Sequence, residues 1–217
     1  MAVLNVAVLI SGRGSNMQSL VRASREPGYP AKIACVISND PAAKGLEWAK
    51  KEGIPTAVVN HKDFGADKRA FEEALDAEIK KQGAQLVCLA GFMRLLTPWF
   101  VDVWRDRLIN IHPSLLPAFT GLHVHQKAID YGARFSGCTV HFVRAEMDHG
   151  PIIAQAAVPV MADDTDITLS ARILEQEHLL YPRCVRWIAE GRVNIHSEKC
   201  FILGESGPEP TINPAVR

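Results

Sequence analysis

The strongest constraint on the fold is a regular alternation between short apolar runs and longer segments of helical periodicity. Residues 3–10 form a continuous apolar run, which is typical of a strand buried on both faces of a parallel sheet. Further runs of strand length lie at residues 32–38, 54–59, 84–90 and 108–111. Helical patterns separate them, at residues 15–25, 41–53, 67–82 and 98–104. This β-α-β-α rhythm predicts an α/β fold whose mostly parallel sheet carries helices on both faces.

The pattern changes after residue 111. A short helix is expected at residues 124–131, and two strands at 136–143 and 152–159. The link between these strands is too short for a crossover helix, so they should form an antiparallel hairpin. A long helix is expected at 167–190, with Thr165 or Asp166 as its N-cap. We therefore predict one domain over residues 1–203, with a Rossmann-like phosphate-binding half to about residue 100, and a flexible tail at 204–217.

Composition excludes several classes of partner. The 217 residues carry 24 basic and 24 acidic side chains, so no basic field is present to hold a nucleic acid. No apolar run reaches the roughly 20 residues that span a bilayer. The first strand pattern follows Met1 without a basic segment or a signal-peptide cleavage site, which predicts a cytoplasmic protein. The five cysteines are odd in number and lack CxxC spacing, so reduced thiols are expected.

A glycine-rich loop lies between the first strand and the first helix. Gly12 and Gly14 allow a tight turn and close approach of a ligand, while Ser15 and Asn16 add polar groups at a helix N-terminus. The loop is therefore a candidate phosphate site, with a plain strand-to-helix turn as the alternative. It is neither a dinucleotide fingerprint, because Met17 stands at the third glycine, nor a P-loop. Asp40, after the second strand, is interpreted as the start of the helix at residue 41 rather than as a ribose-binding acid.

The candidate reaction centre lies at the end of the fifth strand. Asn110 and His112 are two residues apart and should share one face of that strand. A lone histidine there is more often structural, but a proline-rich loop follows and the predicted hairpin supplies Asp148. A carboxylate beside the imidazole would favour the charged imidazolium, which with the Asn110 amide would stabilise oxygen charge on an attacked carbonyl. The contact between Asp148 and His112 is an inference from topology.

Each of three other groups of residues can be interpreted either as structural or as functional. His123 and His125 have a metal-ligand spacing, but they enter a helix where their side chains diverge, so no metal is expected. Residues 92–96 follow the fourth strand and form either a plain core-edge loop or a seat for a flat aromatic ligand. Residues 175–178 are charged and are interpreted as a solvated helix face.

Together these motifs resemble the folate-dependent formyltransferases. The most specific stretch is Asn-Ile-His-Pro-Ser-Leu-Leu-Pro at residues 110–117. The Ser-Gly-Arg-Gly-Ser-Asn loop is similar to the corresponding loop of those family members that formylate a ribonucleotide. Other matching stretches lie at residues 36–39, 89–96, 121–125, 137–143 and 148–155. The resemblance covers the chain to about residue 195 and implies the formyltransferase fold, with residues 101–203 as the catalytic and folate half.

The resemblance also implies a reaction and its residues. The formyl group of 10-formyltetrahydrofolate, a co-substrate, would pass to the amine of glycinamide ribonucleotide in purine (IMP) biosynthesis, with no metal and no covalent intermediate. Asn110 would orient the formyl oxygen, protonated His112 would stabilise the oxyanion, and Asp148 would support His112 and help to move the proton. The substrate would contact Gly14, Ser15, Asn16 and Glu177. The folate would contact Lys68, Met93, Arg94, Leu95, Leu96 and Asn110. The active form would be a monomer or a homodimer.

Two departures and two alternatives accompany this resemblance. Lys68 stands where the family often has an arginine for the folate tail, and a lysine lacks the bidentate fork. Thr120 replaces a proline before Gly121. The alternatives are a hydrolase that releases formate from formyl-folate and a binding module without catalysis; the presence of Asn110, His112 and Asp148 together argues against the module.

Overall fold

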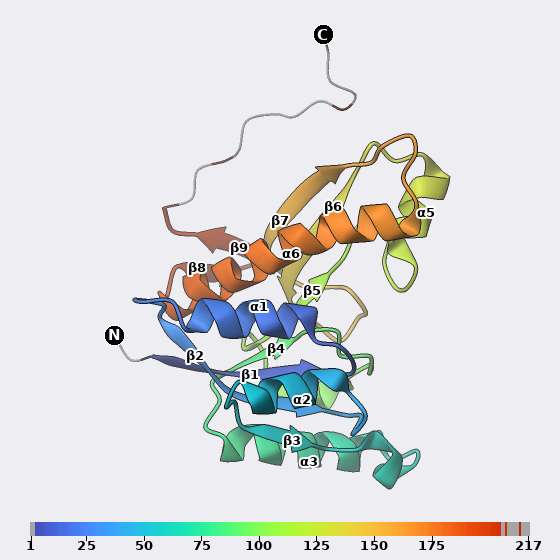
Figure 1. Cartoon of the computed structure of the whole chain (residues 1–217). Helices are drawn as coiled ribbons and strands as arrows, with labels where there is room; N and C mark the ends of the chain where they lie inside the picture. Colours follow the sequence, from blue (N-terminus) through green and yellow to red (C-terminus); the bar gives the residue numbers. More distant parts are fainter. Residues whose placement is uncertain (1–2, 205–206, 208–212, 214–217) are drawn as a thin grey trace.

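The computed structural model describes residues 3–204, 207 and 213, and a seven-stranded sheet forms its centre (Figure 1). The strand order is β3-β2-β1-β4-β5-β6-β7. The first five strands in this order are parallel, and β6 runs antiparallel to both β5 and β7. The strands are β1 (Leu4–Ile10), β2 (Ala31–Ser38), β3 (Thr56–Val58), β4 (Leu86–Leu89), β5 (Leu108–His112), β6 (Phe135–Phe142) and β7 (Ile152–Pro159). The expected fold class, including the β6–β7 hairpin, is confirmed.

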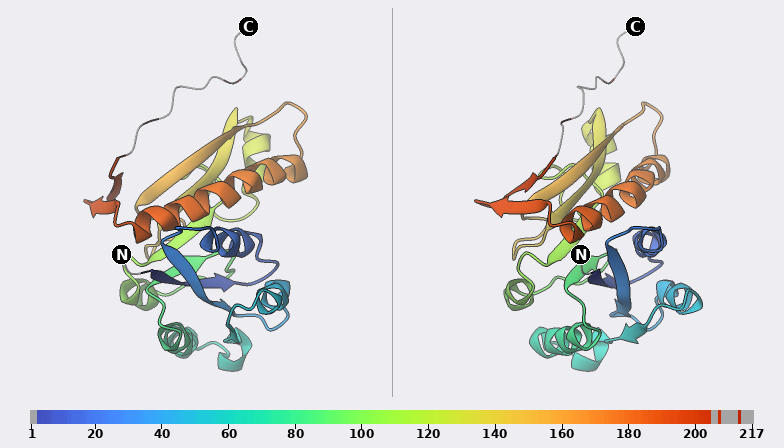
Figure 2. Two further views of the ribbon diagram at one scale, coloured as in Figure 1. Left: turned by 60° about the vertical axis from the view of Figure 1, so that its left-hand side comes forward. Right: turned by 90° about the vertical axis from the view of Figure 1, so that its left-hand side faces the viewer.

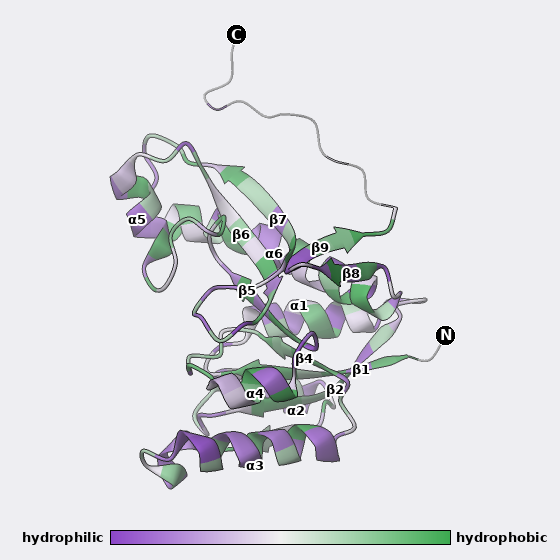
Figure 3. Cartoon of the chain, turned by 180° about the vertical axis from the view of Figure 1, so that it is seen from behind, coloured by the Kyte–Doolittle hydropathy of each residue, from purple (hydrophilic) through white to green (hydrophobic). Residues whose placement is uncertain are grey.

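Helices cover both faces of the sheet, as Figure 2 shows. The helices are α1 (Ser15–Ser24), α2 (Lys44–Lys51), the 3-10 helix η1 (His61–Phe64), α3 (Lys68–Lys81), α4 (Pro98–Val103), α5 (Val124–Tyr131) and α6 (Asp166–Ala189). Helices α1, α2 and α6 pack on one face of the sheet, and α3 and α4 on the other. The outer side of α3 is mostly hydrophilic, whereas the strands are mostly hydrophobic (Figure 3). This two-sided burial explains why the first strand has no polar face.

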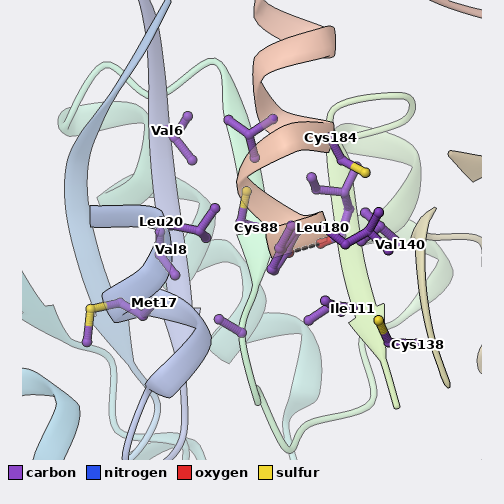
Figure 4. Close-up of a cluster of buried hydrophobic side chains, with 14 of the residues drawn as sticks. Val6, Val8, Met17, Leu20, Cys88, Ile111, Cys138, Val140, Leu180 and Cys184 are labelled. Carbon is purple, nitrogen blue, oxygen red and sulfur yellow. Dashed lines mark hydrogen bonds between the residues drawn. The ribbon is translucent and has the colours of Figure 1, made fainter. Parts of the chain in front are cut away.

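Alternate residues of β1 enter two separate cores. Val6 and Val8 face α1 and α6, while Ala7 and Leu9 face α3 and α4. Figure 4 shows the first core, where Leu180 of α6 lies among side chains from α1 and the strands. Because α1 and α6 share this core, residues at the two ends of the chain are brought side by side.

Two local features differ from the expectation. Helix α2 begins at Lys44 rather than at residue 41, because the Asp40 carboxylate accepts the Ala42 N–H and closes a separate turn. A second hairpin of β8 (Val193–His196) and β9 (Lys199–Ile202) was not expected from the sequence. Its turn residues, Ser197 and Glu198, have φ angles of 48° and 57°. The predicted tail lies outside the described residues, apart from residues 204, 207 and 213.

Hydropathy along the helices bears on membrane association. Within the described part of the chain, no helix has both the length and the apolar character that a membrane span requires.

Candidate active site

The glycine-rich loop lies at the carboxyl end of β1. This strand has β2 on one side and β4 on the other, so the direction in which successive strands are added to the sheet reverses here. Open α/β sheets place ligands at such a switch point. Gly14 is the N-cap of α1 with φ 72°, and a Cβ there would lie 2.9 Å from the Met17 side chain. A cavity of about 260 Å³ opens here, lined by residues 11–16, Ala90, Gly91 and Met93. The free N–H groups of the first turn of α1 give this cavity an affinity for anions.

Glu177 of α6 lies behind this loop. It is buried, so the expectation of a solvated face at residues 175–178 is wrong for this residue. The Asn16 amide donates to the Glu177 carboxylate at 2.6 Å, across 161 positions of sequence. Burial raises the pKa of Glu177, and the hydrogen bond from Asn16 opposes that rise. One N–H of the Asn16 side-chain amide is therefore committed to Glu177, and its second N–H and the backbone N–H are the donors of Asn16 left for an anion in the cavity.

His112 stands at the end of β5, and three segments meet around its ring. Its Nδ1 lies 3.3 Å from the Asp148 carboxylate, and its Nε2 lies 3.1 Å from the Phe119 carbonyl oxygen. The second Asp148 oxygen accepts the Gly121 N–H at 2.7 Å. The contact between Asp148 and His112 is therefore present. Both ring nitrogens therefore lie beside acceptor oxygens, so an N–H on either of them has an acceptor close by.

Asn110 lies on the same strand as His112 and contacts a second histidine. Its amide nitrogen is 3.4 Å from Nε2 of His141 on β6, and Nδ1 of His141 lies 3.1 Å from the Phe142 carbonyl oxygen. Burial lowers the pKa of His141, so this ring is neutral, donates from Nδ1 and accepts at Nε2. No pattern in the sequence indicated that His141 orients the Asn110 amide. One N–H of that amide remains for a substrate oxygen.

Apart from Asn110 on β5, the residues predicted to bind folate lie on two segments, the loop after β4 and the start of α3. The loop after β4 exposes Met93 and Leu95, each at 67%, next to the cavity at the glycine-rich loop. The Met93 N–H donates to Ser11 Oγ at 2.7 Å, which joins this loop to the glycine-rich loop. Lys68 is the first residue of α3; the next residue, Arg69, stacks on Trp99 of α4, 3.7 Å from the ring centroid. Lys68 therefore lies at the end of α3 that faces α4.

Two features of this site escaped the sequence analysis. Ser11 Oγ donates to Asn39 Oδ1 at 2.5 Å, and so ties the ends of β1 and β2 together. Met147 is 58% exposed and its methyl group would touch a Cβ placed at Gly121, which puts an apolar side chain beside Asp148. Ser11 lies in the Ser-Gly-Arg-Gly-Ser-Asn loop, but the sequence analysis gave its hydroxyl no role. Met147 belongs to none of the motifs, so no signal in the sequence singled it out.

The paired histidines at the start of α5 have separate environments. His123 is the N-cap of α5 with φ 58°, and His125 lies 3.5 Å from Asp166 at the start of α6. Among the described residues, no cluster of three or more His, Cys, Asp or Glu side chains has a metal-binding arrangement.

Comparison with known proteins decides the family. A model of the formyl transferase family matches residues 4–185 of the chain. The chain belongs to the formyl transferase family. It is 42% identical to the phosphoribosylglycinamide formyltransferase of Escherichia coli, over 94% of this chain and 96% of that protein.

Longer relatives contain the same unit. The chain is 46% identical to the human trifunctional purine biosynthetic protein adenosine-3, over 93% of this chain but only 19% of that protein, so it spans about a fifth of its length. Among solved structures, the glycinamide ribonucleotide transformylase 1 of Symbiobacterium toebii is 43% identical and superposes with a TM-score of 0.89, covering 93% of this chain and 94% of that one. The resemblance found in the sequence motifs is thereby confirmed at the level of the family.

Proposed function

We propose that this chain transfers the formyl group of 10-formyltetrahydrofolate to the amine of glycinamide ribonucleotide, a step of de novo purine (IMP) biosynthesis. The observation that carries the proposal is the His112 ring, which lies between Asp148 and Phe119 on the strand that also carries Asn110. That strand pairs with β4, and the residues that follow β4 line the cavity at the glycine-rich loop. Two bacterial relatives named phosphoribosylglycinamide formyltransferase, which align over 94% of this chain and 96% of their own length, support it. We also propose that the protein works in the cytoplasm, because its five thiols are unpaired.

The proposed binding mode follows the two sides of the site. The substrate phosphate lies in the cavity against Gly14, Ser15 and Asn16, where helix N–H groups replace a basic patch. Glu177 accepts a sugar hydroxyl while it holds Asn16. The folate ring lies against the exposed apolar side chains of the loop after β4, with Met93, Arg94, Leu95 and Leu96 as its contacts and Lys68 directed to its acidic tail.

In the proposed reaction the substrate amine attacks the formyl carbon directly. The carbonyl electrons move onto oxygen, where the Asn110 amide and the His112 imidazolium stabilise the charge. Asp148 helps to move the amine proton to the leaving folate nitrogen, and the bond from that nitrogen to carbon then breaks. A covalent thiol route is disfavoured, because burial raises the pKa of Cys138 to about 12. No metal is required at any step.

The test follows absorbance when the protein meets 10-formyl-5,8-dideazafolate with and without glycinamide ribonucleotide. Product that requires the ribonucleotide supports the transferase. His112→Ala and Asp148→Asn should each lower kcat by at least about a hundredfold. His149→Ala removes an exposed histidine next to Asp148 and serves as the matched control, with unchanged rates expected.

Each contrary outcome has a clear meaning. Equal product formation without the ribonucleotide would identify a hydrolase. Ligand binding without any product would identify a binding module. Full activity in His112→Ala would remove His112 from the mechanism.

A further inference from the structure

We propose that Arg144 is a positioning residue that holds the Asp148 loop by joining it to the β8–β9 hairpin. The loop comprises residues 143–151 between β6 and β7. The catalytic consequence of this inference rests on the proposed function of Asp148, whereas the mechanical part does not.

The loop has a narrow, rigid base. The Arg144 N–H donates to the His149 carbonyl at 3.1 Å, and the Phe142 N–H donates to the Pro151 carbonyl at 2.9 Å. Gly150 fits between these pairs only because it lacks a side chain, since a Cβ there would lie 2.0 Å from the Phe142 carbonyl oxygen. The backbone of Arg144 is therefore paired directly with the residue that follows Asp148, and a shift of one displaces the other.

The Arg144 side chain is held on three sides. Its Nε donates to Glu198 at 2.6 Å, one terminal nitrogen to Asp106 at 2.8 Å, and the other to the Val143 carbonyl at 3.2 Å. The side chain is only 11% exposed. Exposed ion pairs contribute little on their own, but a planar guanidinium with several aligned acceptors restricts the backbone that carries it.

The two carboxylates belong to parts of the fold that flank the site. Asp106 lies in the turn before β5, the strand that ends in His112. Glu198 lies in the β8–β9 turn, where its φ of 57° directs the chain sharply back, and Arg105 binds its second oxygen at 2.9 Å. The hydrogen bond from Arg144 also holds the pKa of Glu198 below its usual range. Arg144 thus connects the start of β5, the C-terminal hairpin and the loop of Asp148.

None of the residues that form the candidate active site belongs to the β8–β9 hairpin, yet the hydrogen bonds of Arg144 connect the hairpin to the loop that carries Asp148. In Figure 1 the hairpin is drawn near β7 and the end of α6, away from the glycine-rich loop between β1 and α1. The segment after α6 thus serves catalysis by holding the Asp148 loop in place rather than by contacting substrate.

The test combines amide hydrogen exchange with steady-state kinetics on the full chain. Arg144→Met keeps most of the stem and removes the fork, and Glu198→Gln removes one charged acceptor. We expect Arg144→Met to speed exchange in residues 144–150 by at least about fivefold and to lower kcat about tenfold with the KM for ribonucleotide unchanged. Glu198→Gln should have the same effects in weaker form, and Arg144→Lys should fall between Arg144→Met and the unmodified chain.

Glu52→Gln is the matched control, because it breaks another arginine–carboxylate pair, between Arg25 and Glu52, far from the loop. Unchanged exchange in the loop of Arg144→Met would overturn the proposal. Faster exchange with unchanged kcat would overturn the positioning role and leave only a structural one. If the unmodified chain transfers no formyl group, the proposed function fails, and the exchange measurement still decides whether Arg144 holds the loop.

Discussion

Substitution of Gly150 by alanine tests how closely catalysis depends on the base of the Asp148 loop. An added Cβ would lie 2.0 Å from the Phe142 carbonyl oxygen, whereas the ordinary contact between carbon and oxygen is about 3.3 Å. The loop must therefore move by more than about 1 Å, because the Phe142 carbonyl is fixed within the β6 strand. A displacement of that size at a reacting group costs about a hundredfold in rate. The accompanying strain should lower the free energy of unfolding by about 1–3 kcal/mol.

The assay compares kcat in the formyl-transfer reaction with the unfolding midpoint in urea. Gly132→Ala is the control, because Gly132 has a φ of 75° and open space around the added Cβ. That variant pays the backbone cost of a positive φ without any clash, about 1 kcal/mol, and should keep its kcat. A Gly150→Ala protein that lost stability but kept kcat within threefold would refute the argument that the loop base sets the position of Asp148.

Three further predictions concern other parts of the fold. Glu177→Gln should flatten the dependence of stability on pH. Because burial raises the pKa of Glu177, its protonated form stabilises the fold fully below pH 4.5, and this stabilisation is lost as pH rises through the folded pKa. Melting temperatures of both proteins from pH 4.5 to 7.5 test this prediction. Asp164→Asn should lower the free energy of unfolding by about 2 kcal/mol at neutral pH. Hydrogen bonds from Arg172 hold the pKa of Asp164 well below its usual range, so urea titrations should show this loss shrinking as pH falls below 3.8; a loss that is constant with pH would contradict it. Ser11→Ala should raise the KM for formyl-folate about fivefold, because the Met93 N–H loses its acceptor; an unchanged KM would show that this loop is positioned by other contacts.

Much of the architecture follows from local patterns. The strand at residues 3–10 was predicted within one residue of β1, because a parallel strand buried on both faces carries an uninterrupted apolar run. The preference for hydroxyl and carboxylate side chains at helix starts left Thr165 or Asp166 as the α6 N-cap, and the structure shows that Thr165 is the N-cap. The site on β5 was equally accessible, since the two-residue period of a strand places Asn110 and His112 on one face.

The failures have local causes that the sequence conceals. The turn of the β8–β9 hairpin requires positive φ at Ser197 and Glu198, whereas the usual signal for such a turn is Asn-Gly or Asp-Gly. The early start predicted for α2 took Asp40 as the beginning of the helix, whereas the Asp40 carboxylate closes a separate turn before the helix begins.

The sequence by itself therefore determined the succession of elements and the motifs at their ends, because periodicity and capping depend on residues a few positions apart. Tertiary structure alone decided which distant groups meet: Asp148 with His112, Glu177 with Asn16, and Glu198 with Arg144. Each of these contacts joins segments that the sheet order and the shared core bring together. The environment that buries Glu177 and directs Asp148 at an imidazole arises only when those segments have packed, so no local pattern encodes it.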